Sequence, residues 1–192
     1  MYIDCKQEYV AMKRTILLLI MTTCTLISSC QNVSKNPAKM TNDKNPNNPY
    51  YSHTDTTILN LPDATWKKIL PDSIYQVARN KDTERPFTGK YYEYDGLGTY
   101  YCAACGNQLF RSDSKFSSTC GWPSFFETAR KGSVIYKSDN SFGMERTEVL
   151  CGRCGAHLGH LFDDGPPPTG KRFCMNSIVL DFEPDNKNKT GK

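Results

Sequence analysis

Three features are missing from this sequence of 192 residues, and the first two absences each argue against a class of protein. A membrane-spanning helix needs about 20 apolar residues, and the apolar run from Thr15 to Ile27 is too short to span a bilayer comfortably. Nucleic-acid-binding proteins carry clustered basic residues, whereas the net charge here is a mild +4 and is spread evenly. Apart from two Cys-x-x-Cys-Gly segments, the chain has no internal repeat. Its length fits one compact domain with appendages.

The N-terminal segment has the order of a bacterial export signal. The basic pair Lys13-Arg14 precedes the apolar run, and Ile27-Ser28-Ser29-Cys30 ends it. The tetrapeptide resembles the lipobox of bacterial lipoproteins, whose cysteine is lipidated and becomes the mature N-terminus. We therefore expect removal of residues 1–29, a lipid anchor on Cys30, and a bacterial cell-envelope location facing the periplasm or the exterior. An ordinary secretory signal, or cleavage before Cys24, is the alternative.

Composition divides the remaining chain into three parts. Residues 30–57 are rich in Asn, Lys, Pro, Ser and Thr and nearly lack aliphatic side chains, which is typical of a flexible tether. Residues 185–192 have the same character and predict a disordered tail. Residues 58–184 hold the apolar and aromatic side chains that a core needs, so we expect the folded domain there.

Two short helices are predicted at the start of the domain. Asp63 and Asp72 are their candidate N-caps, because apolar residues recur at helical spacing after each. Pro71 ends the first helix, since proline cannot continue it.

From residue 90 the pattern changes to the aromatic and β-branched alternation that is typical of strands. A hairpin is predicted from Lys90–Tyr94 and Gly98–Cys102, with its turn at Asp95-Gly96. Three more strands are predicted at Val134–Tyr136, Met144–Leu150 and Arg172–Leu180. The domain is therefore expected to be mainly antiparallel β, with one core.

Two segments, Cys102-Ala103-Ala104-Cys105-Gly106 and Cys151-Gly152-Arg153-Cys154-Gly155, predict a metal site. Each motif lets two sulfurs face one ion, and its glycine tolerates a positive φ. Four thiolates form a closed tetrahedral shell, so we expect a structural zinc ion. Redox-active dithiols are disfavoured because neither motif lies in a βαβ pattern. A nucleic-acid zinc ribbon is disfavoured because the 45 residues between Cys105 and Cys151 exceed the usual loop.

Cys174 is the candidate nucleophile. In a strand, successive side chains face opposite ways, so Arg172, Cys174 and Asn176 share one face while Phe173 and its alternate neighbours face the core. The nearby guanidinium favours the thiolate, which is the nucleophilic form of cysteine. The alternative is a buried core cysteine.

Two further motifs supply candidate site residues. Trp122, in the loop that begins at Cys120, offers either an apolar wall to a ligand or an ordinary core side chain. His157 and His160 can donate protons near neutral pH. Alternatively, one histidine completes a Cys-Cys-His metal site, because Cys151, Cys154 and His157 are evenly spaced.

Several of these stretches together resemble the B-type methionine sulfoxide reductases, which reduce the R epimer of methionine sulfoxide. The matching stretches are Thr83–Tyr92, Cys102–Phe110, Cys120–Phe125, Arg146–Gly170 and Arg172–Ser177. The resemblance implies two antiparallel sheets around a shallow active site, with zinc on the far side. It also implies that Cys174 is the catalytic cysteine, Cys120 the resolving cysteine, and the four motif cysteines the zinc ligands. The family's substrate-pocket residues match Trp122, His157, His160, Arg172 and Asn176.

The resemblance further implies a reaction. Cys174 attacks the substrate sulfur while His157 or His160 supplies a proton, and the resulting sulfenic acid condenses with Cys120 to a disulfide. A thioredoxin-like dithiol then restores both thiols. The expected substrates are proteins or peptides that contain methionine sulfoxide, and the expected state is a monomer.

The sequence departs from the family pattern at two places, Phe173 where tyrosine is usual and Ser118-Thr119 before Cys120. The first departure removes a hydroxyl near the site, and the second alters the Cys120 loop. The alternative function is a zinc-stapled envelope binding module in which Cys120 and Cys174 form a permanent disulfide.

Overall fold

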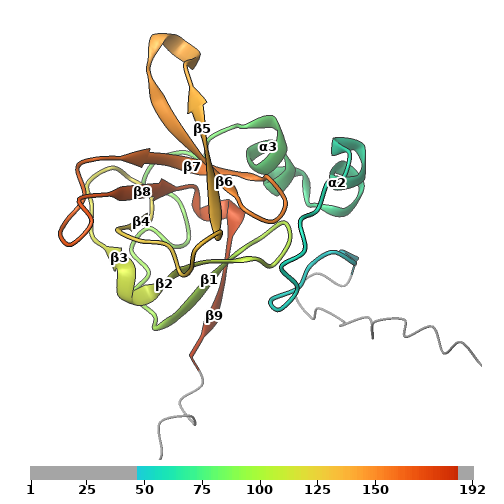
Figure 1. The fold of residues 1–192 in the computed structure, drawn as a ribbon, viewed down its shortest axis with the longest axis horizontal. Helices are drawn as coiled ribbons and strands as arrows, with labels where there is room; N and C mark the ends of the chain where they lie inside the picture. The colour runs from blue at the N-terminus through green and yellow to red at the C-terminus, as the bar shows by residue number, and fades with distance from the viewer. Residues whose placement is uncertain (1–46, 186–192) are drawn as a thin grey trace, which may run out of the picture. The chain divides into compact units, whose positions relative to one another are not determined.

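The computed structural model describes residues 47–185, and Figure 1 shows two helices beside two β-sheets. This architecture confirms the predicted mainly β fold with two antiparallel sheets. None of the helices in this part of the chain has the length and hydropathy of a membrane-spanning segment. The export signal, Cys30 and residues 186–192 lie outside the described residues, so what the sequence indicates for them stays a prediction.

Helices α2 (Asp63–Ile69) and α3 (Asp72–Asn80) occupy the two predicted positions. Their N-cap residues are prolines, Pro62 and Pro71, and neither cap makes a side-chain hydrogen bond. The prediction that Asp63 and Asp72 are the caps is therefore wrong by one residue. Each aspartate begins its helix instead, where its carboxylate interacts favourably with the helix dipole.

All strand pairs are antiparallel. The smaller sheet has the order β2-β1-β9, formed by Gln108–Arg111, Gly98–Cys102 and Leu180–Pro184. The larger sheet has the order β3-β4-β8-β7-β6-β5, formed by Lys115–Phe116, Ser124–Phe125, Arg172–Met175, His157–Phe162, Arg146–Cys151 and Val134–Asp139.

Two strand predictions were wrong. Residues 90–94 form turns and bends, and β1 pairs with β2 and β9 rather than with them. The strand predicted over Arg172–Leu180 ends at Met175, where a 3₁₀ turn over Ser177–Val179 intervenes. Beyond the turn the chain continues as β9 in the other sheet, so the segment after Cys174 connects the two sheets (Figure 1).

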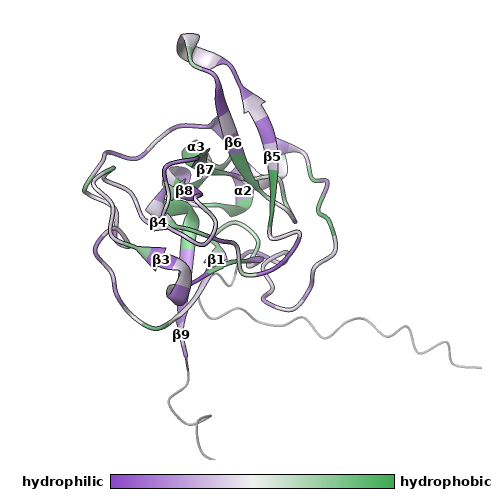
Figure 2. Ribbon diagram, turned by 60° about the vertical axis from the view of Figure 1, so that its left-hand side comes forward, coloured by the Kyte–Doolittle hydropathy of each residue, from purple (hydrophilic) through white to green (hydrophobic). Residues whose placement is uncertain are grey.

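Aromatic side chains fill the core between the sheets. Tyr100, Phe110 and Phe125 are fully buried. The Phe110 and Phe125 rings stack at 4.4 Å, and Tyr100 meets Phe125 edge-on at 5.0 Å. Figure 2 shows the apolar stretches on the inner parts of the strands, whereas the far end of the β5–β6 hairpin is hydrophilic. Phe173 is also buried, on the face of β8 opposite Cys174, so the hydroxyl that it lacks relative to the family pattern is absent on the core side.

Residues 48–57, called the N-terminal strap below, lie against the domain although their composition assigned them to the tether. The strap is held by Arg153, a fully buried residue of the second cysteine motif. Its guanidinium donates to the carbonyls of Tyr50 (2.7 Å) and Thr57 (3.2 Å) and to the carboxylate of Asp55 (2.6 Å). It also donates to the carbonyl of Cys105 at 2.6 Å. One buried cation therefore joins the strap to both cysteine motifs.

Candidate active site

Cys174 lies near the middle of the six-stranded sheet. Its strand, β8, runs between β4 and β7, where Cys174 pairs with Ser124 on one side and His160 on the other. From Arg172 to Met175 the side chains alternate between half-buried and buried, as the sequence pattern indicates. Cys174 is therefore partly accessible on the face that carries His160.

Cys120 lies beside Cys174, and both are free thiols with their Sγ atoms 3.3 Å apart. The hydroxyl of Ser118 lies 3.0 Å from the Cys120 sulfur, and that of Ser124 lies 3.4 Å from it. The two cysteines, 54 residues apart in sequence, are thus close enough to exchange a proton and to form a disulfide.

The two sulfurs hold one proton between them. Hydrogen bonds from Cys174 and, less strongly, from Ser118 and Ser124 lower the pKa of Cys120 to about 4, although burial opposes this. The pKa of Cys174 is raised, first because its thiol donates to Cys120, then because of burial and the neighbouring negative charge. Arg172 lowers the pKa of Cys174, as expected, but the Cys120 thiolate outweighs it. In the resting pair the proton therefore stays on Cys174.

Arg172, the first residue of β8, is fixed by an ion pair that the sequence did not predict. Its guanidinium makes two hydrogen bonds of 2.8 Å with the carboxylate of Asp164, and it lies 4.3 Å from the centre of the Phe162 ring. The carboxylate raises the pKa of Arg172, so the side chain is a permanent cation. It is not among the residues that line the cavity at Cys174.

A cavity of about 520 Å³ opens beside Cys174. Of the predicted site residues, it is lined by Cys174, Trp122, His157, His160 and Asn176. Its lining also includes four charged residues that the sequence did not assign, namely Lys81, Asp139, Arg146 and Glu148. A larger cavity of about 620 Å³ beside Glu84 and Ser177 contains no thiol or imidazole, so the chemistry belongs to the smaller one.

Both histidines reach the cavity although they lie three residues apart on one strand. Strict alternation would place them on opposite faces, but the pairing of β6 with β7 shifts at Leu158, which has no partner residue. This bulge returns both imidazoles to one side, with their ring centres 5.5 Å apart. A bulge is the usual way to re-aim side chains beside a site.

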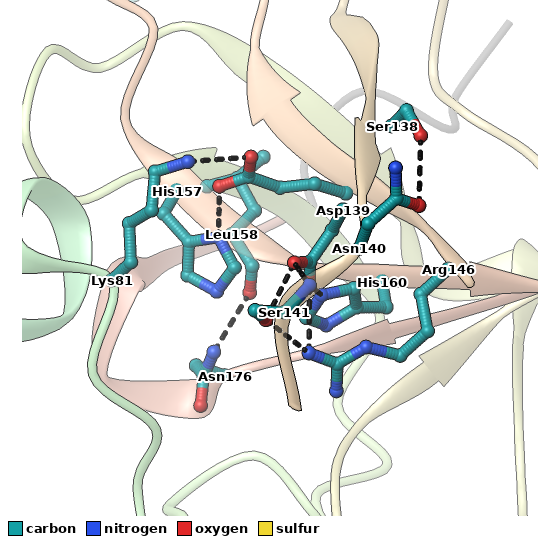
Figure 3. A network of polar contacts seen from close by, with 11 residues as sticks. Lys81, Ser138, Asp139, Asn140, Ser141, Arg146, His157, Leu158, His160 and Asn176 are labelled. Atoms are coloured by element: carbon teal, nitrogen blue, oxygen red, sulfur yellow. Dashed lines mark hydrogen bonds and ion pairs between the residues drawn. The ribbon is translucent and has the colours of Figure 1, made fainter. Parts of the chain in front are cut away.

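Each imidazole is bonded to its own carboxylate, as Figure 3 shows. His157 bonds through Nδ1 to the Oε1 atom of Glu148 at 2.8 Å. His160 bonds through Nε2 to the Oδ2 atom of Asp139 at 2.8 Å. Burial lowers the pKa of His157, and Glu148 acts in the opposite direction.

Trp122 and Asn176 line the cavity, and both are hydrogen-bonded to the backbone of Glu84. The indole N–H of Trp122 donates to the Glu84 carbonyl at 3.3 Å, and the ring is half-buried rather than part of the core. Asn176 is buried, accepts the Glu84 N–H through Oδ1 at 3.1 Å, and donates to the Leu158 carbonyl at 3.2 Å. Its amide therefore holds the end of β8 against β7.

The four motif cysteines form a separate, buried cluster. Their sulfurs all lie within 4.8 Å of one another, and two of the separations are 3.8 Å and 3.6 Å. A tetrahedral zinc–thiolate site with bonds of about 2.3 Å has sulfurs about 3.8 Å apart, so the cluster fits a metal ion. Gly106 and Gly155 have φ values of 77° and 68°, as the motif requires. The alternative with His157 as a ligand does not hold, because the group that can hold a metal consists of the four cysteines and does not include this ring.

Glu148 is a site residue that the sequence analysis missed although the sequence pattern could have indicated it. It stands between Thr147 and Val149 in a predicted strand, and a carboxylate in such a position needs a partner. Pairing of the strands places it next to His160, which is next to Cys174 in the same row. Lys81 gave no comparable signal, because its partner Glu148 lies 67 residues away along the chain.

A dithiol pair beside two carboxylate-bound imidazoles, in a β domain with a four-cysteine site, defines a thiol-dependent oxidoreductase. The SelR domain matches residues 70–184, which is more than half of the chain. The chain belongs to the SelR-domain family of B-type methionine sulfoxide reductases, which confirms the resemblance seen in the sequence.

Relatives that match over most of their own length support this assignment. A protein named peptide methionine sulfoxide reductase MsrB from Methanosarcina barkeri is 52% identical over 127 residues, which cover 66% of this chain and 89% of the relative. The protein of that name from Pseudomonas putida is 55% identical over 119 residues, covering 62% and 90%. The one from Leptospira interrogans is 52% identical over 125 residues, covering 65% and 95%. These relatives do not favour the alternative of a binding module.

Proposed function

We propose that this protein reduces the R epimer of methionine sulfoxide in proteins to methionine. The observation that carries the proposal is the 3.3 Å approach of the Cys120 and Cys174 sulfurs beside a cavity that contains two imidazoles. Sulfoxide reduction needs a nucleophilic sulfur, a proton donor for the oxygen, and a second thiol that ends the cycle. Cys174 and both imidazoles line this cavity, and Cys120 supplies the second thiol 3.3 Å from Cys174.

The reaction conserves atoms and electrons at each step. Cys174 transfers its proton to Cys120 and attacks the sulfoxide sulfur, while a histidine protonates the sulfoxide oxygen, which then passes from the substrate sulfur to the Cys174 sulfur. The substrate leaves as methionine, and the oxygen remains on Cys174 as sulfenic acid. Cys120 then attacks the Cys174 sulfur and forms the disulfide, and the proton that it received from Cys174 passes to the departing hydroxyl group, which leaves as water. Trp122 offers an apolar wall to the S-methyl group of the substrate.

The disulfide must be reduced before another turnover. A dithiol attacks one of its sulfurs and leaves as a disulfide, so two electrons and two protons return to Cys120 and Cys174. We infer that a thioredoxin-like protein supplies this dithiol. The half-buried position of Cys120 supports the inference, because an external thiolate can approach it.

We infer that the ion at the cysteine cluster is zinc. Four thiolates in tetrahedral separation suit zinc and leave no position for water, so its contribution is structural. Cys102 and Cys105 flank the turn between β1 and β2, and Cys151 and Cys154 flank the turn between β6 and β7. These residues would therefore join the two sheets.

We also propose that the protein is attached to the bacterial cell envelope by a lipid on Cys30, facing the periplasm or the exterior. The support is the order of a basic pair, an apolar run and small residues before this cysteine. Incorporation of labelled fatty acid into the expressed chain, and its loss in Cys30→Ala, tests the proposal. A chain that carries no label would contradict it.

Turnover of separate epimers tests the proposed activity. The full chain, reduced and loaded with zinc, is given a peptide with R or S methionine sulfoxide and a chemical dithiol. We expect methionine from the R epimer alone, and no methionine with Cys174→Ser. Absence of turnover with both epimers would overturn the proposal.

A further inference from the structure

Glu148 is a buried carboxylate with both oxygens in use. The residue is only 2% exposed, in the middle of β6. Its Oε1 atom bonds His157 Nδ1 at 2.8 Å, and its Oε2 atom accepts from the ammonium group of Lys81 at 2.7 Å. Figure 3 shows Lys81 and His157 side by side, and all three residues line the cavity. Burial of an ionised carboxylate costs several kcal/mol unless it is paired, so these two bonds permit the charge.

Lys81 comes from outside the sheet. It follows the last residue of α3 in a left-handed backbone conformation, with φ of 60°, which turns the chain back toward the cavity. Its side chain is about half exposed, whereas Glu148 and His157 are buried. The end of α3 thus places the ammonium group of Lys81 beside the buried carboxylate of Glu148.

The two histidines differ in which ring nitrogen remains available. Nε2 lies at the tip of an imidazole, farther from the backbone than Nδ1. His157 bonds its carboxylate through Nδ1, so its tip is free, and Figure 3 shows the second nitrogen of the ring on the side away from the dashed bond. His160 bonds Asp139 through Nε2, so its tip is already engaged. Asp139 is in turn held by Ser141 and Arg146.

We propose that His157 is the proton donor of the reaction and that Glu148 and Lys81 are its positioning residues. The proposal rests on the function proposed above and names the residues that make its proton step possible. Glu148 accepts the Nδ1 hydrogen, fixes the ring orientation and stabilises the imidazolium form. Lys81 keeps Glu148 ionised and in place. The Nε2 hydrogen then passes to the sulfoxide oxygen, and His157 is left neutral.

The charged groups around His157 determine its pKa, and so the pH at which it loses its proton. Glu148 from β6 raises the pKa of His157, whereas burial, which is the largest effect, lowers it. His160 and the ammonium group of Lys81 lower it further. The other titratable or charged groups around the cavity come from β8, β5 and β6, namely Cys174, Asp139 and Arg146.

The first test is Glu148→Gln, which keeps the shape of the side chain and removes its charge. Without the carboxylate, the pKa of His157 falls, so the alkaline limb of the kcat/KM–pH profile moves to lower pH. We expect the limb to move by about one pH unit, which corresponds to a tenfold loss at a pH above it. Titration of the His157 ring by NMR gives the same shift without reference to turnover.

Asp139→Asn is the matched control, because it removes the carboxylate of the other imidazole. We expect it to leave the alkaline limb in place. If Asp139→Asn moves the limb and Glu148→Gln does not, His160 is the donor and the proposal is wrong. If wild-type protein has no activity, the proposed function fails first, so the two failures are distinguishable.

Lys81→Met is a second variant, at a half-exposed side chain, that does not disturb the core. Hydrogen bonding by Lys81 lowers the pKa of Glu148, against the opposing effect of burial, which is larger than any other single effect. In Lys81→Met the pKa of Glu148 therefore rises, and the acidic limb moves to higher pH. Lys81→Arg should restore the wild-type limb. An unchanged acidic limb in Lys81→Met would contradict the role given to Lys81.

Discussion

Cys120 and Cys174 share one proton across 3.3 Å, and this pair sets the reactivity of the site. The arrangement keeps Cys174 protonated at rest and gives Cys120 the negative charge. In the proposed reaction, a resting thiolate on Cys120 can accept the proton of Cys174, which favours the first step, in which Cys174 attacks. Arg172 acts against the raised pKa of Cys174, and it stabilises the negative charge on Cys174 once its proton has moved to Cys120.

Removal of Cys120 should therefore make Cys174 more acidic. In Cys120→Ala, the hydrogen bond and the charge that raise the pKa of Cys174 are gone, while Arg172 still lowers it. We expect alkylation of Cys174 by iodoacetamide at pH 7 to be about tenfold faster than in wild type, corresponding to one pKa unit. Peptide mapping by mass spectrometry measures the rate at this residue.

The matched control for that measurement is the double variant Cys120→Ala with Arg172→Met. We expect the gain in rate to disappear, because the cation that favours the thiolate is absent. An alkylation rate in Cys120→Ala equal to that of wild type would contradict the shared-proton interpretation.

The sequence could predict site residues that lie within motifs, but not those that meet only in space. Cys174, Trp122 and both histidines stand in recognisable segments, and the structure brings them to one cavity. Lys81 and Glu148 are 67 residues apart, and their contact depends on where α3 ends and how β6 is paired. The sequence also did not predict that Cys120 carries the negative charge, because this depends on the distance between the two sulfurs in space and not on their separation along the chain.

Among the structural elements, the N-terminal strap shows how composition alone can mislead. Its residues are mostly polar, yet three hydrogen bonds from the buried guanidinium of Arg153 hold them against the domain. Sequence composition reports the lack of apolar side chains, not the presence of a buried donor elsewhere. The predicted hairpin between residues 90–94 and β1 was wrong for a related reason. β1 pairs with β2 and β9, and local sequence does not show which segments will pair.

Arg153→Met should loosen this strap. The substitution keeps the apolar stem but removes every hydrogen bond, so we expect the free energy of unfolding to fall by about 2 kcal/mol. Limited proteolysis should then cut within residues 48–57. Lys171→Met is the control, because Lys171 and Asp163 form an exposed ion pair, and removal of such a pair costs at most about 1 kcal/mol. Equal effects of the two substitutions would contradict the role of the strap.

For the molecule as a whole, the cysteine cluster and the segment after Cys174 are two of the connections between the sheets of the described domain. The cluster joins the β1–β2 turn to the β6–β7 turn, and the 3₁₀ turn over Ser177–Val179 leads from β8 to β9. The fold class was predictable because strand periodicity and the cysteine spacing are local signals. The division of strands between sheets was not, because it depends on pairing between distant segments.

Metal removal should destabilise the whole domain. An ion at a concentration of about 1,000 times its dissociation constant stabilises the fold by about 4 kcal/mol, so its loss should lower Tm by roughly 10 °C. Circular dichroism before and after treatment with a chelator and a reductant gives Tm, and mass spectrometry gives the metal content. Addition of zinc should restore the melting curve, whereas magnesium should not. An unchanged Tm in metal-free protein would contradict a structural ion.

The most direct test of the central claim is a single turnover without any external reductant. Fully reduced chain and excess R-sulfoxide peptide should give one methionine per chain, with the loss of the Cys120 and Cys174 thiols together. Cys120→Ser should still form one methionine and retain a sulfenic acid on Cys174, which dimedone traps, while Cys174→Ser should form none. Methionine formed by Cys174→Ser, or formed by wild type with both thiols intact, would contradict the account.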